Sequence, residues 1–160
     1  MVEMKMKTNR IMKIKSSKKK LLMISYDKKK KQSICLYEGN KEKRVALKPY
    51  QILEELCLRN GSSYEGRKES FCFITGARQK PAILISERTQ DLYFPTASKK
   101  NEDCVWILYN QVFKVKSIDS MNARILFLDG TKVNIPYDSR ILNKQLKRCA
   151  LFLDGINLVE

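Results

Sequence analysis

The sequence predicts an α+β fold, a single β-rich domain in which an antiparallel sheet packs with two helices. Three observations predict it. Short β-prone runs alternate with turn residues along most of the chain. Asp129-Gly130 separates two such runs, and this pair suits the positive φ angles of a tight hairpin turn. Apolar residues recur at helical spacing in two segments, 49–59 and 141–153, and no repeat or linker divides the chain.

The first 60 residues are expected to contain a hairpin and a helix. Residues 1–20, rich in Met and Lys, are predicted to be a flexible basic arm that precedes the folded domain at 21–160. Strands are expected at 21–26 and 33–37, and the lysine-rich turn between them forms either a basic hairpin tip or a solvated loop. Pro49 suits a first helical turn and Asn60-Gly61 a helix end, which predicts a short helix between them.

The rest of the chain is expected to supply most of the sheet. A loop at 61–68 leads into a strand through Phe71, Phe73 and Ile74 that ends at Gly76. Further strands are expected at 82–85 and 92–94 and within 105–115, and the hairpin at 125–135. The closing helix carries four basic residues on its polar side and ends before Gly155; these are Arg140, Lys144, Lys147 and Arg148.

The charge of the chain points to an anionic partner. Among 160 residues, 32 are Lys or Arg and 17 are Asp or Glu, which gives a net charge of +15. Residues 1–48 alone hold 16 basic and 4 acidic side chains. A field of this strength attracts polyanions such as nucleic acid, anionic lipid or acidic protein. Because no apolar run has the length of a membrane span or a signal peptide, a cytoplasmic location without a membrane partner is expected.

The composition argues against catalysis. The chain has no histidine, which excludes Ser-His-Asp and Cys-His mechanisms and histidine metal sites. Its five cysteines form no C-x-x-C pair, so they are expected to be buried thiols in a reducing compartment. The carboxylates show no paired arrangement for a metal. We therefore expect a protein that is not an enzyme, with no catalytic residue, no metal and no cofactor.

The most informative stretch is Gly61-Ser62-Ser63-Tyr64-Glu65-Gly66-Arg67-Lys68. Two glycines, two hydroxyls and a basic pair after a helix are typical of a phosphate-binding loop, and a plain helix-to-strand turn is the alternative. The stretch is not a Walker loop, because no hydroxyl residue follows Lys68.

This stretch and four shorter ones resemble the competence transcription factor (ComK) family over residues 33–155. The shorter ones are Lys48-Pro49-x-Gln51-Ile52, Lys80-Pro81, Phe94-Pro95-Thr96 and Cys104-x-Trp106-Ile107. The resemblance implies a DNA-binding activator of the DNA-uptake genes that establish competence for transformation. It also implies recognition of paired A/T-rich promoter boxes, mainly through the minor groove, by a homo-oligomer that acts on the transcription machinery.

Two departures from the family pattern suggest a shortened or divergent member. The lysine-rich first thirty residues lie outside the pattern, and the longer tail that other members carry beyond the last helix is missing after Glu160. Control by an adaptor and protease through such a tail is therefore not carried over to this chain.

The resemblance and the charge pattern together give a predicted DNA site. Arg67 is expected to insert into the narrow minor groove of an A-tract, whose negative potential attracts arginine. Lysines and Arg78 are expected to contact phosphates, the serines and Gly66 to allow close approach, and Tyr64 to stack on DNA or pack beneath the loop. The predicted DNA-binding residues are Ser62, Ser63, Tyr64, Gly66, Arg67, Lys68, Arg78, Lys80, Lys99 and Lys100. Phe152 is expected on an exposed apolar face of the last helix that mediates self-association.

Three other functions are compatible with the sequence. An RNA-binding or ribosome-associated protein would use Phe71, Phe73, Tyr93 and Phe94 as stacking aromatics on strands. A nucleotide-binding transferase would use the loop at 62–68. A membrane-surface protein would be held by its lysine-rich arm.

Overall fold

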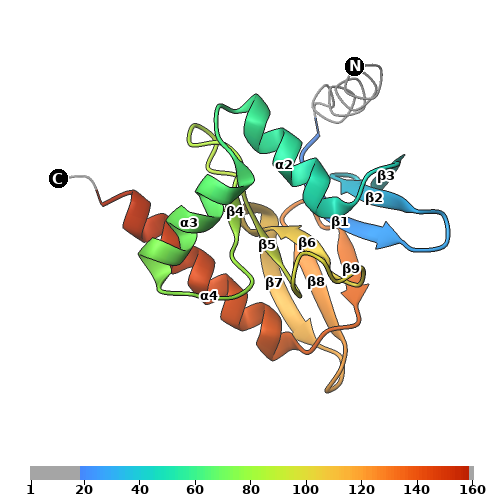
Figure 1. Ribbon diagram of the computed structural model, residues 1–160. Coiled ribbons are helices and arrows are strands. Elements are labelled where there is room, and N and C mark those ends of the chain that lie inside the picture. The colour runs from blue at the N-terminus through green and yellow to red at the C-terminus, as the bar shows by residue number, and fades with distance from the viewer. Residues whose placement is uncertain (1–18, 159–160) are drawn as a thin grey trace, which may run out of the picture.

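The computed structural model describes residues 19–158, so the expected arm lies outside the described residues except for Lys19 and Lys20. Figure 1 shows the arrangement of its strands and helices. In chain order the elements are β1 (Leu21–Asp27), β2 (Gln32–Tyr37), β3 (Lys41–Val45), α2 (Pro49–Arg59), α3 (Tyr64–Thr75), β4 (Ile83–Leu84), β5 (Leu92–Pro95), β6 (Trp106–Leu108), the 3-10 helix η1 (Tyr109–Gln111), β7 (Val112–Ser117), β8 (Ala123–Phe127), β9 (Lys132–Ile135) and α4 (Ser139–Ile156).

The strands form two antiparallel sheets. A six-stranded sheet has the order β3-β2-β1-β6-β5-β4, and a three-stranded sheet has the order β7-β8-β9. Successive side chains of β6 point to opposite faces of the larger sheet, as the pleat requires. Trp106 and Leu108 enter one apolar cluster, which also holds the buried face of α2, whereas Ile107 enters a second cluster with α4 and the smaller sheet. The predicted α+β class is therefore confirmed, with the larger sheet between two apolar clusters.

Most of the expected elements are present. The hairpin at 125–135 is the β8–β9 pair, and Gly130 has a φ of +92°, a value that a side chain would disfavour. The helix after Pro49 is α2, with Ile52 and Leu53 fully buried. At its start the Gln51 side chain accepts a hydrogen bond from the backbone N–H of Lys48 at 2.8 Å. The motif Lys48-Pro49-x-Gln51 is thus a helix start.

The expected loop at 64–68 and the strand through Phe71, Phe73 and Ile74 are wrong, because residues 64–75 form the helix α3. Residues 19–158 therefore contain three α-helices where two were predicted. The Ser63 hydroxyl caps the helix by accepting from Gly66 N, and Gly76 ends it at a φ of +73°. The alternation of Phe71 and Phe73 suggested a strand, but Phe71 is fully buried and Phe73 is 89% exposed.

Two smaller differences concern β3 and the end of the chain. The strand β3 was not predicted, because its first four residues, Lys41 to Arg44, are all charged and exposed on the edge of the larger sheet. Gly155 was expected beyond the last helix but lies within α4. A Cβ at this position would clash with Cγ2 of Ile74, so the glycine lets α4 approach α3. Among the described helices none is long and apolar enough to cross a membrane.

Candidate nucleic-acid interface

The residues of the stretch at 61–68 have mainly structural roles. Gly61, at a φ of +77°, follows α2, and the Ser62 hydroxyl donates to the Cys57 carbonyl oxygen at 3.2 Å. Ser63 Oγ accepts from the backbone N–H of Gly66 at 3.0 Å. A Cβ on Gly66 would lie 3.0 Å from the same oxygen, so a glycine there leaves room for the cap. The serines and Gly66 therefore hold the junction between α2 and α3.

Tyr64 belongs to the core beneath the surface. It is 4% exposed, and its ring meets that of Trp106 edge-on at a centroid distance of 6.2 Å. The ammonium of Lys99 lies 4.6 Å from the centroid of Tyr64 and 5.3 Å from that of Tyr50. Lys99 also pairs with Glu65 at 3.6 Å. These contacts fix Lys99 above the aromatic rings.

Five of the predicted DNA-binding residues line one surface hollow of about 440 Å³. They come from three segments: α3, the loop 76–81 and the loop 96–105. No acidic residue lines this hollow, and Lys68, Arg78 and Lys80 form no ion pair with any residue of 19–158. The five residues are Tyr64, Lys68, Arg78, Lys80 and Lys99. The fold therefore gathers four cationic side chains here, of which Lys99 pairs with Glu65 and the other three have no ion-pair partner in residues 19–158.

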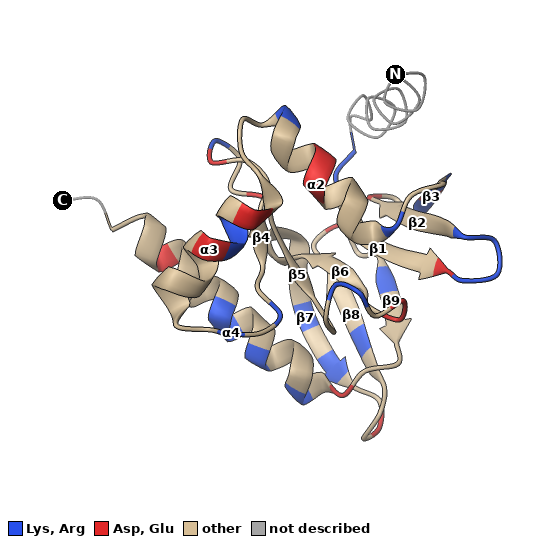
Figure 2. Ribbon diagram, in the orientation of Figure 1, with Lys and Arg blue, Asp and Glu red and all other residues tan. Residues whose placement is uncertain are grey.

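A second hollow of about 420 Å³ adjoins the first, and Lys80 lines both. Its other basic side chains come from α4 and are Arg140, Lys144 and Arg148. Asp138 is its acidic residue, and its carboxylate is paired with Arg140 at 2.6 Å, an interaction that lowers the pKa of Asp138. We call the two hollows together the basic ridge. In Figure 2, Lys and Arg positions recur along α4, in the loop before β6 and in the β1–β2 turn.

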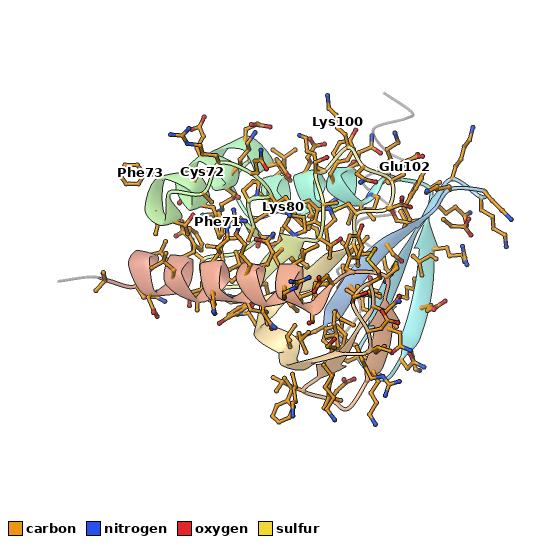
Figure 3. All side chains as sticks on the ribbon, turned by 90° about the horizontal axis from the view of Figure 1, so that it is seen from below. Phe71, Cys72, Phe73, Lys80, Lys100 and Glu102 are labelled. Carbon is orange, nitrogen blue, oxygen red and sulfur yellow. The ribbon has the colours of Figure 1, made fainter. Side chains whose placement is uncertain are left out.

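The loop that carries Arg78 and Lys80 is held against α4 by side chains of that helix. Gln145 is 2% exposed, and its amide donates to the carbonyl oxygens of Lys80 at 3.0 Å and Pro95 at 2.7 Å. Arg148 donates to the carbonyl oxygen of Gln79 and lies 5.6 Å from the Phe71 ring. In Figure 3, Lys80 lies beside α4, where it is seen between this helix and α3.

Arg67 does not line the hollow of the five residues above but a separate one, which it shares with Ser62 among the predicted residues. Its side chain is 14% exposed, and it pairs with Glu87 at 3.3 Å in a cleft beside the loop 85–91. Insertion into a DNA groove would require the guanidinium to leave that cleft. DNA contact by Arg67 stays a prediction, and the basic ridge is complete without it.

The predicted residue Lys100 is exposed beside this ridge. It lines a small depression with Lys48 and Tyr26, and Lys99 lines both this depression and the first hollow. The β1–β2 turn is also basic. Within it Lys28 pairs with Asp103 at 2.6 Å, while Lys29, Lys30 and Lys31 are exposed.

The helices α2 and α3 do not have the surface charge expected of a DNA-binding helix-turn-helix motif. The exposed residues of α3 include Glu65, Glu69 and Phe73, which follow one another at four-residue spacing along the helix. A stripe with two carboxylates would repel the phosphates beside a major groove. The basic helix of this fold is α4.

Sequence reasoning missed the contribution of α4 to the ridge. The basic side of the last helix was visible, but its contact with the loop 76–81 depends on Gln145 and Arg148, whose partners are distant in sequence. The expectation that Phe152 is exposed is wrong. It is 1% exposed and packs on Phe71 at a ring-centroid distance of 5.1 Å.

The five cysteines are free thiols, and four of them are buried. Burial raises the pKa of Cys35 to about 12 and that of Cys57 to about 11, so both stay protonated at neutral pH. Within residues 19–158 no group of three or more Cys, Asp or Glu side chains could hold a metal ion.

A compact α+β domain with a surface ridge of many cations and few carboxylates has the surface of a polyanion-binding protein. The family model described as ComK protein matches residues 12–157, nearly the whole chain, and this chain belongs to that family. The competence transcription factor of Bacillus subtilis (strain 168) is 31% identical over 106 residues, which are 66% of this chain and 55% of that protein. The match thus spans about half of the relative's length. No solved structure matches the chain significantly.

Proposed function

We propose that this protein is a DNA-binding transcriptional regulator that activates competence genes and contacts A/T-rich promoter boxes through the basic ridge. The observation that carries the proposal is the position of Lys80, which joins two hollows lined by cations from α3, α4 and two loops. The family membership and the printed name of the Bacillus relative support the same function.

The shape of the ridge favours backbone and minor-groove contact. Its cations come from α3, from the loops that carry Arg78, Lys80 and Lys99, and from α4, so the positive charge is spread over several surface segments. Phosphates need only charge and hydrogen-bond donors, whereas the narrow groove of an A-tract strengthens the negative potential that attracts such donors. Arg78 and Lys80 are the side chains that we assign to the groove edge.

Salt dependence of binding tests the ridge. Fluorescence anisotropy with a duplex carrying paired A/T boxes would be measured from low to high salt for the intact chain and for Arg78→Ala, Lys80→Ala and Lys144→Ala. Each lost phosphate contact should make the slope of log K against log salt shallower by about 0.9. The matched controls are Lys114→Ala and Lys132→Ala, which remove exposed charges from the smaller sheet. Equal effects in both groups would reject the ridge as the DNA site.

Base substitutions in the boxes test whether the protein recognises the minor groove. Replacing A·T pairs in the boxes by inosine·cytosine pairs keeps the minor-groove pattern without the guanine amino group but changes the major-groove pattern. A minor-groove reader should bind the substituted boxes nearly as well as the natural ones, and G·C boxes much more weakly. Loss of binding to the inosine boxes would contradict minor-groove recognition.

Two boxes imply at least two protein copies placed at a helical-turn spacing on one face of the duplex. Sedimentation with one-box and two-box duplexes should give one and two bound units. Competition by structured RNA as strong as by the A/T duplex would instead favour the RNA-binding alternative.

A further inference from the structure

A hollow of about 800 Å³ lies outside the basic ridge. It lies between the junction of α2 and α3, the loop 85–91 and the start of β1, and its volume is in the usual range for small-molecule sites. Apolar side chains of Leu21, Leu56 and Ile85 line part of it. We call it the Arg67 cleft.

Arg67 has an incomplete set of partners in this cleft. Its Nη1 donates to Oε1 of Glu87 at 3.3 Å, a long distance for a charged pair. Its Nε is buried and has no hydrogen-bond partner. Glu87 is 81% exposed, so its carboxylate is well solvated and holds the guanidinium weakly. A buried donor without an acceptor is unfavourable, and an anion bound side-on to the edge that carries Nε would satisfy it.

The other charged groups favour an anion with more than one negative charge. Lys19, Lys20, Arg67 and Arg88 line the cleft against the two carboxylates Glu87 and Asp91. Lys20 pairs with Asp91 at 3.4 Å, whereas Arg88 forms no ion pair with any residue of 19–158.

Hydroxyl groups supply further donors. The hydroxyls of Ser86 and Thr89 line the same cleft, and neither donates a hydrogen bond to the described part of the chain. A tetrahedral oxyanion can accept from a guanidinium edge and from hydroxyls at the same time.

We propose that the Arg67 cleft binds a phosphate group, with Arg67 as the bidentate donor and Arg88, Ser86 and Thr89 as further donors. The phosphate comes either from a small phosphorylated molecule, which the volume of the cleft accommodates, or from a DNA strand. In both cases the carboxylate of Glu87, which pairs with Nη1, competes with the phosphate for the positive charge of the guanidinium. The proposal does not depend on the DNA function of the basic ridge.

The test is a titration of the full chain with pyrophosphate in chloride buffer at constant ionic strength, followed by thermal shift and by amide chemical shifts of residues 85–91. Pyrophosphate should raise Tm and move those amide signals. Arg67→Gln should weaken pyrophosphate binding about tenfold or more, since the bidentate donor is lost. Glu87→Gln, on the surface, should strengthen it about threefold by removing the competitor. Arg124→Gln, on the outer face of the smaller sheet, should change nothing.

Absence of any response to pyrophosphate in the intact chain would overturn the proposal. Equal pyrophosphate binding by Arg67→Gln and Arg124→Gln would also overturn it. So would weaker pyrophosphate binding by Glu87→Gln, a variant that should fold normally because Glu87 is exposed. A parallel titration with duplex DNA identifies the source. If Arg67→Gln also weakens DNA binding and pyrophosphate competes with DNA, the phosphate belongs to the duplex. If the DNA affinity of Arg67→Gln stays within about twofold of that of the natural protein, the phosphate belongs to a small molecule. Since the pyrophosphate titration contains no DNA, failure of the ridge leaves this result unaffected.

Discussion

Gln145 on α4 donates a hydrogen bond to the carbonyl oxygen of Lys80, 65 residues earlier in the chain, at 3.0 Å. The same amide nitrogen donates to the Pro95 carbonyl oxygen at 2.7 Å. One buried side chain thus fixes the loop 76–81 to both α4 and β5. The shape of the basic ridge depends on this amide, although Gln145 itself is 2% exposed and does not reach solvent.

Replacing Gln145 by Leu should therefore affect both stability and DNA binding. The buried carbonyl oxygen of Pro95 and the partly buried one of Lys80 would lose their donor, and an unsatisfied buried group costs about 1–3 kcal/mol. Urea unfolding should show this loss, and anisotropy at fixed salt should show weaker binding to an A/T-box duplex. Gln145→Glu is the matched variant, since it keeps the size but removes the amide donor. Full DNA affinity in a folded Gln145→Leu protein would show that the loop is held by other contacts.

Lys80 separates the roles of backbone and charge. Its φ is +52°, a left-handed conformation that costs a residue with a side chain about 1–2 kcal/mol. Lys80→Gly should therefore keep most of the stability of the protein, whereas the β-branched Lys80→Val should lose stability. Both variants should lose the same increment of DNA affinity, because both remove the same charge. Thermal unfolding measures the stability of the two variants, and anisotropy measures their DNA affinity. If Lys80→Val, the less stable variant, also bound DNA more weakly than Lys80→Gly, the assignment of Lys80 to a direct DNA contact would be refuted.

Phe152 and Phe73 are opposite cases of an aromatic residue on a helix. Phe152→Ala should destabilise the protein by about 3–5 kcal/mol, because the ring is buried against Phe71. Phe73→Ala should change stability little, since the ring is 89% exposed, and Figure 3 shows it projecting from the outer end of α3. Chemical denaturation of the two variants checks this. Equal losses would mean that Phe73 is covered in solution, for example by a second copy.

The thiols should differ in reactivity. Burial keeps the pKa of Cys35 and Cys57 well above neutrality, so these side chains remain thiols and react slowly. Cys72 on α3 is partly exposed and should be the first to react with iodoacetamide at pH 8. Mass spectrometry should find one modified site in the native protein and none in Cys72→Ser. Rapid modification of further sites would indicate local opening of the core.

Acid should weaken the start of α4. Side-chain and backbone hydrogen bonds from Arg140 lower the pKa of Asp138, so the carboxylate stabilises the fold above its ordinary pKa. This stabilisation is lost as pH falls through the lowered folded-state pKa. The stability difference between the natural protein and Asp138→Asn should therefore be largest near neutrality and shrink below about pH 4. Urea unfolding at several pH values measures it, and a difference that grows on acidification would contradict the role of the carboxylate.

Local signals predicted a large part of this fold. Pro49, Asp129-Gly130 and the apolar spacing of 141–153 mark elements whose boundaries depend on nearby residues, and those elements are present. The helix α3 was missed because one exposed aromatic, Phe73, imitated a strand pattern, and Ser63 was interpreted as a ligand group when it is a helix cap. β3 has no apolar pattern, because only Val45 is buried.

The DNA-binding role of the predicted residues stays a prediction, but the sequence named five residues that the fold brings to one hollow. Lys68 lies within α3, whereas Arg78, Lys80 and Lys99 lie in loops. Arg67 could not be separated from Lys68 without the helix, which turns neighbouring side chains about 100° apart. The participation of Arg140 and Lys144 depends on long-range contacts of Gln145 and Arg148 that no local pattern encodes.

The outermost strands of the larger sheet limit how this protein can associate. On one side Lys41 to Arg44 put four charges on a border strand, and on the other side β4 has two residues and is covered by α3. Short or charged borders discourage neighbouring molecules from continuing a sheet. Copies that bind paired boxes, as proposed above, would therefore be expected to join through side-chain surfaces. This restriction favours small, countable assemblies over open-ended fibres.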